Sequence, residues 1–384
     1  MFNFTFHNPT KILFGKGMIA KLPTVLDKTH KILLAYGGGS IKQNGVYDQV
    51  TAALKGYNVV EFSGIEANPQ YATCMKALDV VKKERVDFLL AVGGGSVLDA
   101  IKFVAAAAKF PGAEPWDILT KGGAVEAALP LGCVLTLPAT GSESNGNAVI
   151  SRAETGEKLA FASDHVFPQF AVLDPETTFS LPPRQVANGV VDAFAHVMEQ
   201  YLTYDVNAPL QDRLAEGILL TLIEEGPKAL AAPHDYDVRA NIMWSATVAL
   251  NTLIGKGVPQ DWTTHQIGHE LTALHGIDHA RTLSIIMPAV IKHQRRYKGD
   301  KIVQYGRRVW GIEERDREKA IDRAIEKTVA FFKQMGVPTC LADVSLTPKE
   351  VWKAVDAHEK RGSRLGEHRH IGAKEVGEIL QLAA

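Results

Sequence analysis

The sequence predicts an α/β domain with a parallel sheet, followed by an all-helical domain. Residues 1 to about 180 alternate short apolar stretches with amphipathic helical stretches, a pattern typical of a parallel sheet flanked by helices. Beyond Leu181 the apolar residues recur with the 3.6-residue period of helices. At 384 residues the chain exceeds the usual size of one hydrophobic core. We therefore expect two domains, residues 1–181 and 182–384, with the functional site in the cleft between them.

The composition is that of an ordinary globular protein. Hydrophobic residues make up 46% and charged residues 22%, which excludes disordered, fibrous and membrane compositions. A net charge of -1 provides no general attraction to nucleic acid or anionic lipid. The N-terminus lacks the plan of a signal peptide, so we expect a cytoplasmic protein. Cys74, Cys133 and Cys340 are too few and too scattered for a disulfide framework or a cysteine zinc site.

Two similar units in the first half predict nucleotide binding. The apolar stretch Lys31–Tyr36 leads into Gly37–Ser40, and the stretch Phe88–Val92 leads into Gly93–Ser96. In both, glycines would let the backbone approach a ligand closely, and the N-terminus of the helix that follows favours phosphate. One copy of Gly-Gly-Gly-Ser is more simply a flexible turn. Two copies, each at the end of a strand, favour a functional role.

The first of these turns also predicts the cofactor. Enzymes that prefer NAD usually carry a carboxylate at the end of this strand, and this chain has none there. Backbone N–H groups, a hydroxyl and an ammonium group are available instead for a 2'-phosphate, from Gly37, Gly38, Gly39, Ser40 and Lys42. We therefore expect NADPH to be preferred over NADH. A separate GxGxxA match beginning at Gly15 is discounted, because no acidic residue follows about 20 positions later.

A third strand, Val134–Leu137, leads into a turn rich in hydroxyl groups, Pro138–Asn145. Such a turn can line a cofactor pocket, or it can be an ordinary turn in which Ser142 or Ser144 caps the next element. The residues alone leave both interpretations open. Lys158 lies beyond this turn, where a solvated hairpin lysine is the simpler interpretation.

The second half reads as a series of helices that begins near Pro182. Long stretches with helical period include Ala208–Glu225, Val238–Leu253 and Ile321–Met335. The basic run His293–Lys301 is interpreted as a solvated helix end rather than a binding patch. His368 and His370, near the C-terminus, are interpreted as exposed loop histidines.

The stretch from Asp192 to His279 concentrates side chains that bind metals. Asp192 and His196 are four residues apart, and so are His265 and His269, a spacing that places both members of each pair on one helix face. His275 and His279 lie in the same stretch. A carboxylate with neutral imidazoles suits Zn²⁺ or Fe²⁺. The metalloprotease motif HExxH is absent, because Gln266 follows His265 and Ala273 stands where a second histidine would follow His269.

Five segments, in this order, carry a resemblance that covers essentially the whole chain. They are Phe14–Gly17, Gly93–Asp99, Leu137–Asn145, Leu181–His196 and the histidine block 265–279. Together they resemble the iron-containing, group III alcohol dehydrogenases, most closely the branch of NADPH-dependent aldehyde reductases. The resemblance implies hydride transfer from NADPH to an aldehyde, reversibly with the primary alcohol, in a homodimer that acts on small molecules. From the net charge and the lack of a long apolar run, we expect neither nucleic acid nor a membrane as a partner.

The resemblance also implies roles for particular residues. The implied metal ligands are Asp192, His196, His265 and His279, with Zn²⁺ or Fe²⁺ as the ion. His269 is implied to face substrate and nicotinamide, where it would relay a proton or orient the substrate. Further cofactor contacts are implied for Gly94, Gly95, Ser96, Asp99, Asn68, Thr136, Thr140, Asn145 and Lys158.

Three alternatives remain open at this stage. One is an NAD-dependent polyol dehydrogenase of the same fold, acting on glycerol or a diol. Another is a lyase similar to dehydroquinate synthase, for which a more basic pocket would be expected. The third is a metal-binding protein without catalytic activity.

Overall fold

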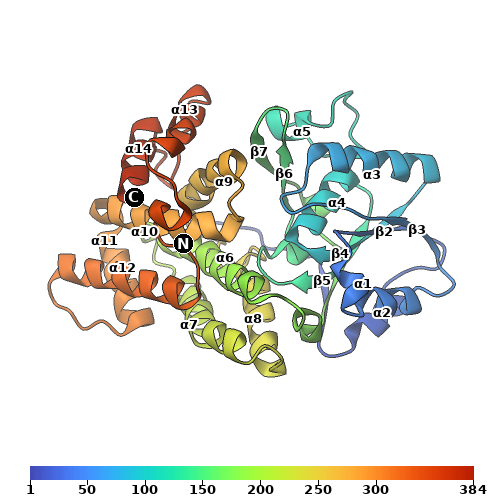
Figure 1. The fold of residues 1–384 in the computed structure, drawn as a ribbon, viewed down its shortest axis with the longest axis horizontal. Helices are drawn as coiled ribbons and strands as arrows, with labels where there is room; N and C mark the ends of the chain where they lie inside the picture. The colour runs from blue at the N-terminus through green and yellow to red at the C-terminus, as the bar shows by residue number, and fades with distance from the viewer. The chain divides into compact units, whose positions relative to one another are not determined.

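A computed structural model describes all residues from Met1 to Ala384 and separates into two compact units (Figure 1). The sheet unit comprises His7–Leu181 and His234–Thr247. The helical unit comprises Met1–Phe6, Pro182–Pro233 and Val248–Ala384. None of the helices has both the length and the apolar character needed to cross a membrane.

The sheet unit is built on six parallel strands in the order β1-β8-β5-β4-β2-β3. Their bounds are β1 Lys11–Phe14, β2 Lys31–Tyr36, β3 Asn58–Phe62, β4 Phe88–Gly94, β5 Leu131–Leu137 and β8 Phe170–Leu173. The chain adds β3 outside β2 and then returns to place β4 on the other side of β2. The strand order therefore reverses between β2 and β4, and in open α/β sheets ligands bind at such a point.

Helices cover both faces of this sheet, so its central strands are apolar throughout rather than alternating. Leu33 and Ala35 of β2 face one core, and Ile32 and Leu34 face the other. Helices α3 (Tyr71–Glu84) and α4 (Gly95–Ala107) cover the first face, while α1, α2 and η1 cover the second (Figure 1). The bounds of the last three are α1 Ser40–Gln43, α2 Val46–Ala53 and η1 Met18–Thr24.

Smaller elements complete the sheet unit. An antiparallel hairpin joins β6 (Asn147–Arg152) to β7 (Glu157–Ala162), and the short helices are α5 Asp117–Thr120, η2 Ser142–Ser144, η3 Asp164–Val166 and η4 Pro175–Thr178. Helix α8 (Tyr236–Ala249) also belongs here, except for its last two residues. Its Met243 is fully buried in the core beside α3 and α4, and its Trp244 packs edge-on against Phe14 of β1.

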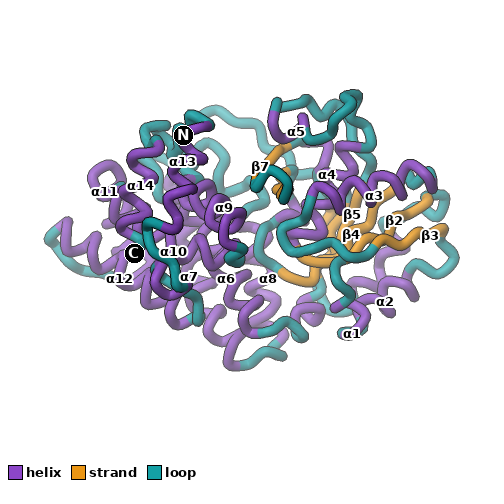
Figure 2. The backbone as a smooth tube through the Cα atoms, turned by 45° about the horizontal axis from the view of Figure 1, so that its top comes forward, coloured by secondary structure: helices purple, strands orange, loops and turns teal.

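The helical unit contains no strand (Figure 2). Its helices are α6 Pro183–Tyr201, α7 Pro209–Ala231, α9 Thr263–His275, α10 His279–His293, α11 Arg295–Trp310, α12 Arg317–Gln334, α13 Lys353–Lys360 and α14 Ala373–Leu382, with short η5 Leu341–Val344 and η6 Glu350–Trp352. Helix α6 is buried from Val186 to Tyr201. A helix buried all round must satisfy its polar side chains internally.

The expected fold class is confirmed: a parallel α/β unit is present, and the chain beyond it is helical. Helices α7, α8 and α12 lie where the helical period predicts them. The interpretation of His293–Lys301 as a solvated helix end is wrong for Lys298, whose side chain is only 5% exposed. Its ammonium group pairs with Asp261 and Glu367, which are distant in the sequence.

Candidate metal and cofactor sites

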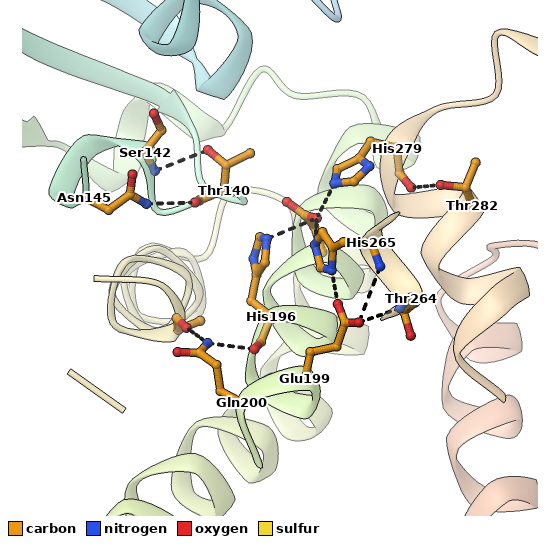
Figure 3. Close-up of polar contacts among 12 residues, drawn as sticks. Thr140, Ser142, Asn145, His196, Glu199, Gln200, Thr264, His265, His279 and Thr282 are labelled. Atoms are coloured by element: carbon orange, nitrogen blue, oxygen red, sulfur yellow. Dashed lines mark hydrogen bonds and ion pairs between the residues drawn. The ribbon is translucent and has the colours of Figure 1, made fainter. Parts of the chain in front are cut away.

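Three imidazoles converge on one carboxylate oxygen in the helical unit. The Nε2 atoms of His279, His196 and His265 lie 3.6, 3.8 and 4.0 Å from Asp192 Oδ1. Figure 3 shows these rings turned toward the same point. Helix α6 supplies Asp192 and His196 one turn apart, while His265 comes from the first turn of α9 and His279 opens α10.

The donor set fits a divalent transition-metal ion. Asp192, His265 and His279 offer donor atoms that all lie within 4.8 Å of one another, and the His196 ring stacks on His265 with centroids 4.7 Å apart. Ligand atoms about 2.0–2.2 Å from one tetrahedral ion are roughly 3.3–3.6 Å apart, so the observed separations need only a small contraction. Asp192 Oδ1 is buried without a hydrogen bond, as expected of an atom that accepts a cation. The residues present therefore fit a metal centre.

Two other histidines of this stretch occupy different positions. The His269 ring lies beside the cluster, with its centroid 5.1 Å from that of His279 and 6.3 Å from that of His265. The group of mutually close donor atoms does not include it. His275 is the last residue of α9 and lies outside the same group. The His279 side chain is 22% exposed, so it is the most open of the four candidate ligands.

A buried charge triad lies next to the start of α9. It consists of Lys298 of α11 with Asp261 and Glu367, and the Lys298 ammonium group contacts both carboxyl groups. Burial raises the pKa of Asp261, but the Lys298 charge outweighs it and brings the pKa to about 2. Burial raises the pKa of Glu367 to about 7, and the neighbouring Asp261 adds to the rise. The triad joins three distant parts of the chain.

The three turns predicted to bind the cofactor follow three neighbouring strands. Gly37–Ser40 follows β2, Gly93–Ser96 spans the end of β4, and the turn after Leu137 follows β5. Gly39 has φ +100°, which disfavours any residue with a Cβ, and a Cβ on Gly38 or Gly39 would meet open space. A Cβ on Gly95 would stand only 2.4 Å from Thr140 Oγ1. The glycines thus bring the second and third turns together and leave space at the first.

Lys42, expected beside the 2'-phosphate, lies among aromatic rings. Its ammonium group is 4.6 Å from the Tyr47 ring centroid and 5.2 Å from that of Tyr36. Both hydroxyls donate to Glu61 of β3, and Lys42 Nζ lies 4.0 Å from the same carboxylate. A hydrogen bond with Tyr36 raises the pKa of Lys42. The sequence does not indicate this role of Glu61, because the residue lies on the neighbouring strand, far from the glycine turn along the chain.

Asn68, Ser96 and Lys158 meet near the second glycine turn. Lys158 donates to Asn68 Oδ1 at 2.9 Å, and the Asn68 backbone N–H donates to Ser96 Oγ at 3.3 Å. Lys158 is only 8% exposed, so it is not the solvated hairpin lysine that its local sequence suggests. Thr136 lies on β5 and is 9% exposed.

Asp99 and Asn145 are joined through Ser142 and Lys102, and the sequence motifs alone do not indicate a role for Lys102. Lys102 is fully buried and donates to Ser142 Oγ, Asn145 Oδ1 and the Asn147 carbonyl at 2.8 to 3.0 Å. Ser142 in turn donates to Asp99 Oδ1 at 2.7 Å. Burial lowers the pKa of Lys102 to about 8, which the Asp99 charge opposes. A lone lysine in the apolar run of α4 is the signal that could have identified it.

Two family models match nearly the whole chain. The family model for iron-containing alcohol dehydrogenases matches residues 9–175, and the C-terminal model of the same family matches 186–384. The chain is 58% identical to the NADPH-dependent aldehyde reductase YqhD of Escherichia coli (strain K12), over 97% of both chains. It is 41% identical to a probable NADH-dependent butanol dehydrogenase of Bacillus subtilis (strain 168), over 99% of both.

Solved structures show the same fold. The crystal structure of E. coli K-12 YqhD superposes with a TM-score of 0.98 at 56% identity, covering 100% of this chain and 99% of that one. An NADH-dependent butanol dehydrogenase A from Thermotoga maritima superposes with a TM-score of 0.96 at 39% identity, with the same coverage.

Proposed function

The chain belongs to the iron-containing alcohol dehydrogenase family, and from this membership we propose that it reduces aldehydes to primary alcohols with NADPH, reversibly. The observation that carries the proposal is the 58% identity, over 97% of both chains, to a reductase of that description. The balanced reaction consumes one aldehyde, one NADPH and one proton, and it yields one alcohol and one NADP⁺.

We assign the cofactor to residues of 1–181 and the metal to residues of 182–384. The turns after β2, β4 and β5 bind the dinucleotide, with glycine N–H groups and the N-terminus of α4 facing phosphate. Asp192, His196, His265 and His279 hold one Zn²⁺ or Fe²⁺ ion. When bound, NADPH supplies the hydride and the ion supplies Lewis-acid stabilisation of the charge that develops on the carbonyl oxygen.

The protein's own residues orient these groups and handle the proton. His269 lies beside the candidate ligand imidazoles without joining the group of close donor atoms, which supports a role for its ring in orienting the substrate or passing it a proton. Asn68 and Lys158 hold each other beside Ser96 and present hydrogen-bonding groups to the nicotinamide half of the cofactor.

Cofactor choice follows from the turn after β2. Several relatives about 40% identical are named as NADH-dependent, so fold alone does not decide it. Here Gly39 leaves open space where NAD enzymes place a carboxylate, and Lys42 provides positive charge nearby. Glu61 on β3 accepts hydrogen bonds from two tyrosines and lies 4.0 Å from Lys42, which reduces its repulsion of a 2'-phosphate.

One assay tests the proposal. Purified protein loaded with Zn²⁺ or Fe²⁺ should oxidise NADPH when butanal is added, followed by the loss of NADPH absorbance. NADH should give a much lower kcat/KM, and glycerol should cause little reduction of NAD⁺ to NADH. Absence of NADPH oxidation with any of a series of aliphatic aldehydes would contradict the proposal, and efficient glycerol oxidation would favour the polyol alternative.

A homodimer is the assembly that we propose. Phe2, Phe4 and Phe6 alternate along the N-terminal segment, and each is 43 to 52% exposed. Exposed large apolar side chains in a row mark an interface, and family membership makes a second copy the partner. Sedimentation equilibrium should give twice the chain mass of 41.8 kDa. Replacing Phe4 and Phe6 together by Ser should give the monomer mass, and a monomeric wild-type protein would rule the dimer out.

A further inference from the structure

Glu199 of α6 lies outside the residues assigned so far, yet it touches one candidate ligand twice. Its carboxylate Oε2 contacts Nδ1 of the His265 ring (Figure 3). Its Oε1 accepts the backbone N–H groups of Thr264 at 2.6 Å and of His265 at 3.4 Å. The side chain is only 5% exposed. One buried carboxylate therefore contacts both the ring and the backbone of His265.

The backbone contacts tie α9 to α6. The first N–H groups of a helix have no partner within it, and the side chain of Trp262, the N-cap residue of α9, does not cap them. Asp261 accepts the N–H of Thr263 at 2.7 Å, and Glu199 accepts the next two. Because Glu199 stands on the helix that carries Asp192 and His196, it fixes α9 in position against that helix.

The ring contact determines how His265 faces the other ligands. Its Nε2 points toward Asp192 Oδ1, 4.0 Å away, while Nδ1 points toward Glu199. A neutral imidazole that binds a metal through Nε2 must carry its proton on Nδ1, and ligand histidines almost always donate that N–H to a carboxylate, a carbonyl or water. Glu199 supplies the carboxylate.

We propose that Glu199 is a positioning residue of the metal centre: it holds His265 with Nε2 toward the ion and keeps α9 in register with α6. The inference rests on the metal assignment made under Proposed function. The sequence carried a signal for it, because Asp192, His196 and Glu199 are spaced four and three residues apart, on one face of a helix.

Glu199→Gln tests this role because the substitution keeps the shape of the side chain and removes one of its two hydrogen-bond acceptors. The carboxylate uses one oxygen for the backbone of α9 and the other for the His265 ring. A glutamine has a single oxygen, so its NH₂ group must face either Nδ1 or the Thr264 N–H. If it faces Nδ1, the ring proton moves to Nε2 and blocks the metal. If it faces the backbone, the first turn of α9 is disturbed.

The expected result is weaker metal binding with intact cofactor binding. The Zn²⁺ dissociation constant, measured by competition with a coloured chelator on metal-depleted protein, should rise about 10- to 100-fold in Glu199→Gln. The kcat of the zinc-saturated variant should fall, while the dissociation constant for NADPH should stay unchanged, because the cofactor residues lie in the sheet unit.

The matched control is Glu216→Gln, which alters another buried carboxylate of the helical unit. Glu216 is 4% exposed and bonds to Tyr201, Arg213 and Arg308, away from the candidate ligands. Its loss should lower the melting temperature and leave the Zn²⁺ dissociation constant unchanged. Wild-type zinc affinity in Glu199→Gln would overturn the inference. A wild-type protein that binds no divalent ion would instead overturn the metal assignment itself.

A measurement on the wild-type protein keeps the inference testable if Glu199→Gln does not fold. In zinc-loaded protein with ¹⁵N-labelled histidine, one ring should be metallated at Nε2 and carry an Nδ1 proton shifted strongly downfield by its carboxylate partner. A metal centre in which no ligand ring shows such a proton would overturn the role of Glu199.

Discussion

At the residue scale, the arrangement around Asp192 separates the candidate ligands from their neighbours. His279 Nε2 lies 3.6 Å from Asp192 Oδ1, whereas His269 stands beside the candidate ligand rings, outside the group of close donor atoms. His279→Ala should therefore lose most of its bound metal and its activity. His269→Ala should keep one metal ion per chain and show a lower kcat. Metal analysis after dialysis, together with kcat, measures both.

Each substitution serves as the control for the other, because both remove one imidazole from the same region. Loss of the metal in His269→Ala would place that residue among the ligands. Full metal content in His279→Ala would show that His279 is not a ligand. Melting temperatures should accompany these data to exclude unfolding as the cause.

The turn after β2 allows a second prediction at this scale. Gly39→Asp adds a negative charge where we expect the 2'-phosphate, so the KM for NADPH should rise far more than the KM for NADH. Because Gly39 has φ +100°, any side chain there also strains the backbone. Gly39→Asn carries the same strain without the charge and isolates the charge effect. An equal change of both KM values in Gly39→Asp would show that the 2'-phosphate lies elsewhere.

At the element scale, Lys102 connects α4 to the turn after β5. Replacing it by Met would remove a donor from two buried acceptors, Ser142 Oγ and Asn145 Oδ1, at about 1–3 kcal/mol for each one left unsatisfied, and from the part-buried Asn147 carbonyl. The Lys102→Met protein should melt at a lower temperature and bind NADPH more weakly, with metal content unchanged. The control is Lys109→Met, because Lys109 is exposed and lies just beyond the end of α4. This substitution should leave the melting temperature, the NADPH affinity and the metal content unchanged. Calorimetry and NADPH titration test the prediction.

Helices and strands were easier to predict than the long-range contacts of individual side chains. The strands before both glycine turns, and helices α7, α8 and α12, follow from apolar patterns that are local in the sequence. From the local sequence alone, a solvated lysine is the simpler interpretation of both Lys298 and Lys158. Their partners, Glu367 and Asn68, lie far away along the chain, and the spacing of apolar residues in the sequence does not indicate such contacts. A cluster of candidate metal ligands could be predicted because few side-chain types bind metals, and the structure brings donor atoms of Asp192, His265 and His279 close together. Their binding of a metal ion stays a prediction.

At the scale of the whole molecule, the buried charge triad links stability to pH. Burial raises the pKa of Glu367 from 4.5 to about 7, so folding favours its protonated form. The stabilisation from that form is complete below about pH 4.5, the unfolded value, and is lost as the pH rises through about 7. Asp261 shifts the opposite way, to about 2, so its contribution is constant over this range.

Urea unfolding across that pH range should therefore show wild-type stability falling toward neutral pH. Glu367→Gln removes the titrating group, so its stability should fall less between pH 4.5 and 7. Glu378→Gln is the control, since Glu378 is an exposed carboxylate of α14 that pairs with His293 at the surface. Parallel pH profiles for wild-type protein and Glu367→Gln would contradict the prediction.

Helix α8 has a consequence for how the protein is made. The sheet unit takes residues 234–247 from beyond a long helical segment, and Thr247 supplies the hydrogen bond to the fully buried Glu143. Domains tend to fold during synthesis as soon as they are complete. Here the ribosome must translate residues 182–233 before the sheet unit has all its parts, so this unit cannot be completed before part of the helical unit has been synthesised. A gene fragment that stops at residue 181, or a chimera joined there, would therefore produce a sheet whose core lacks Met243 and whose buried carboxylate lacks its partner.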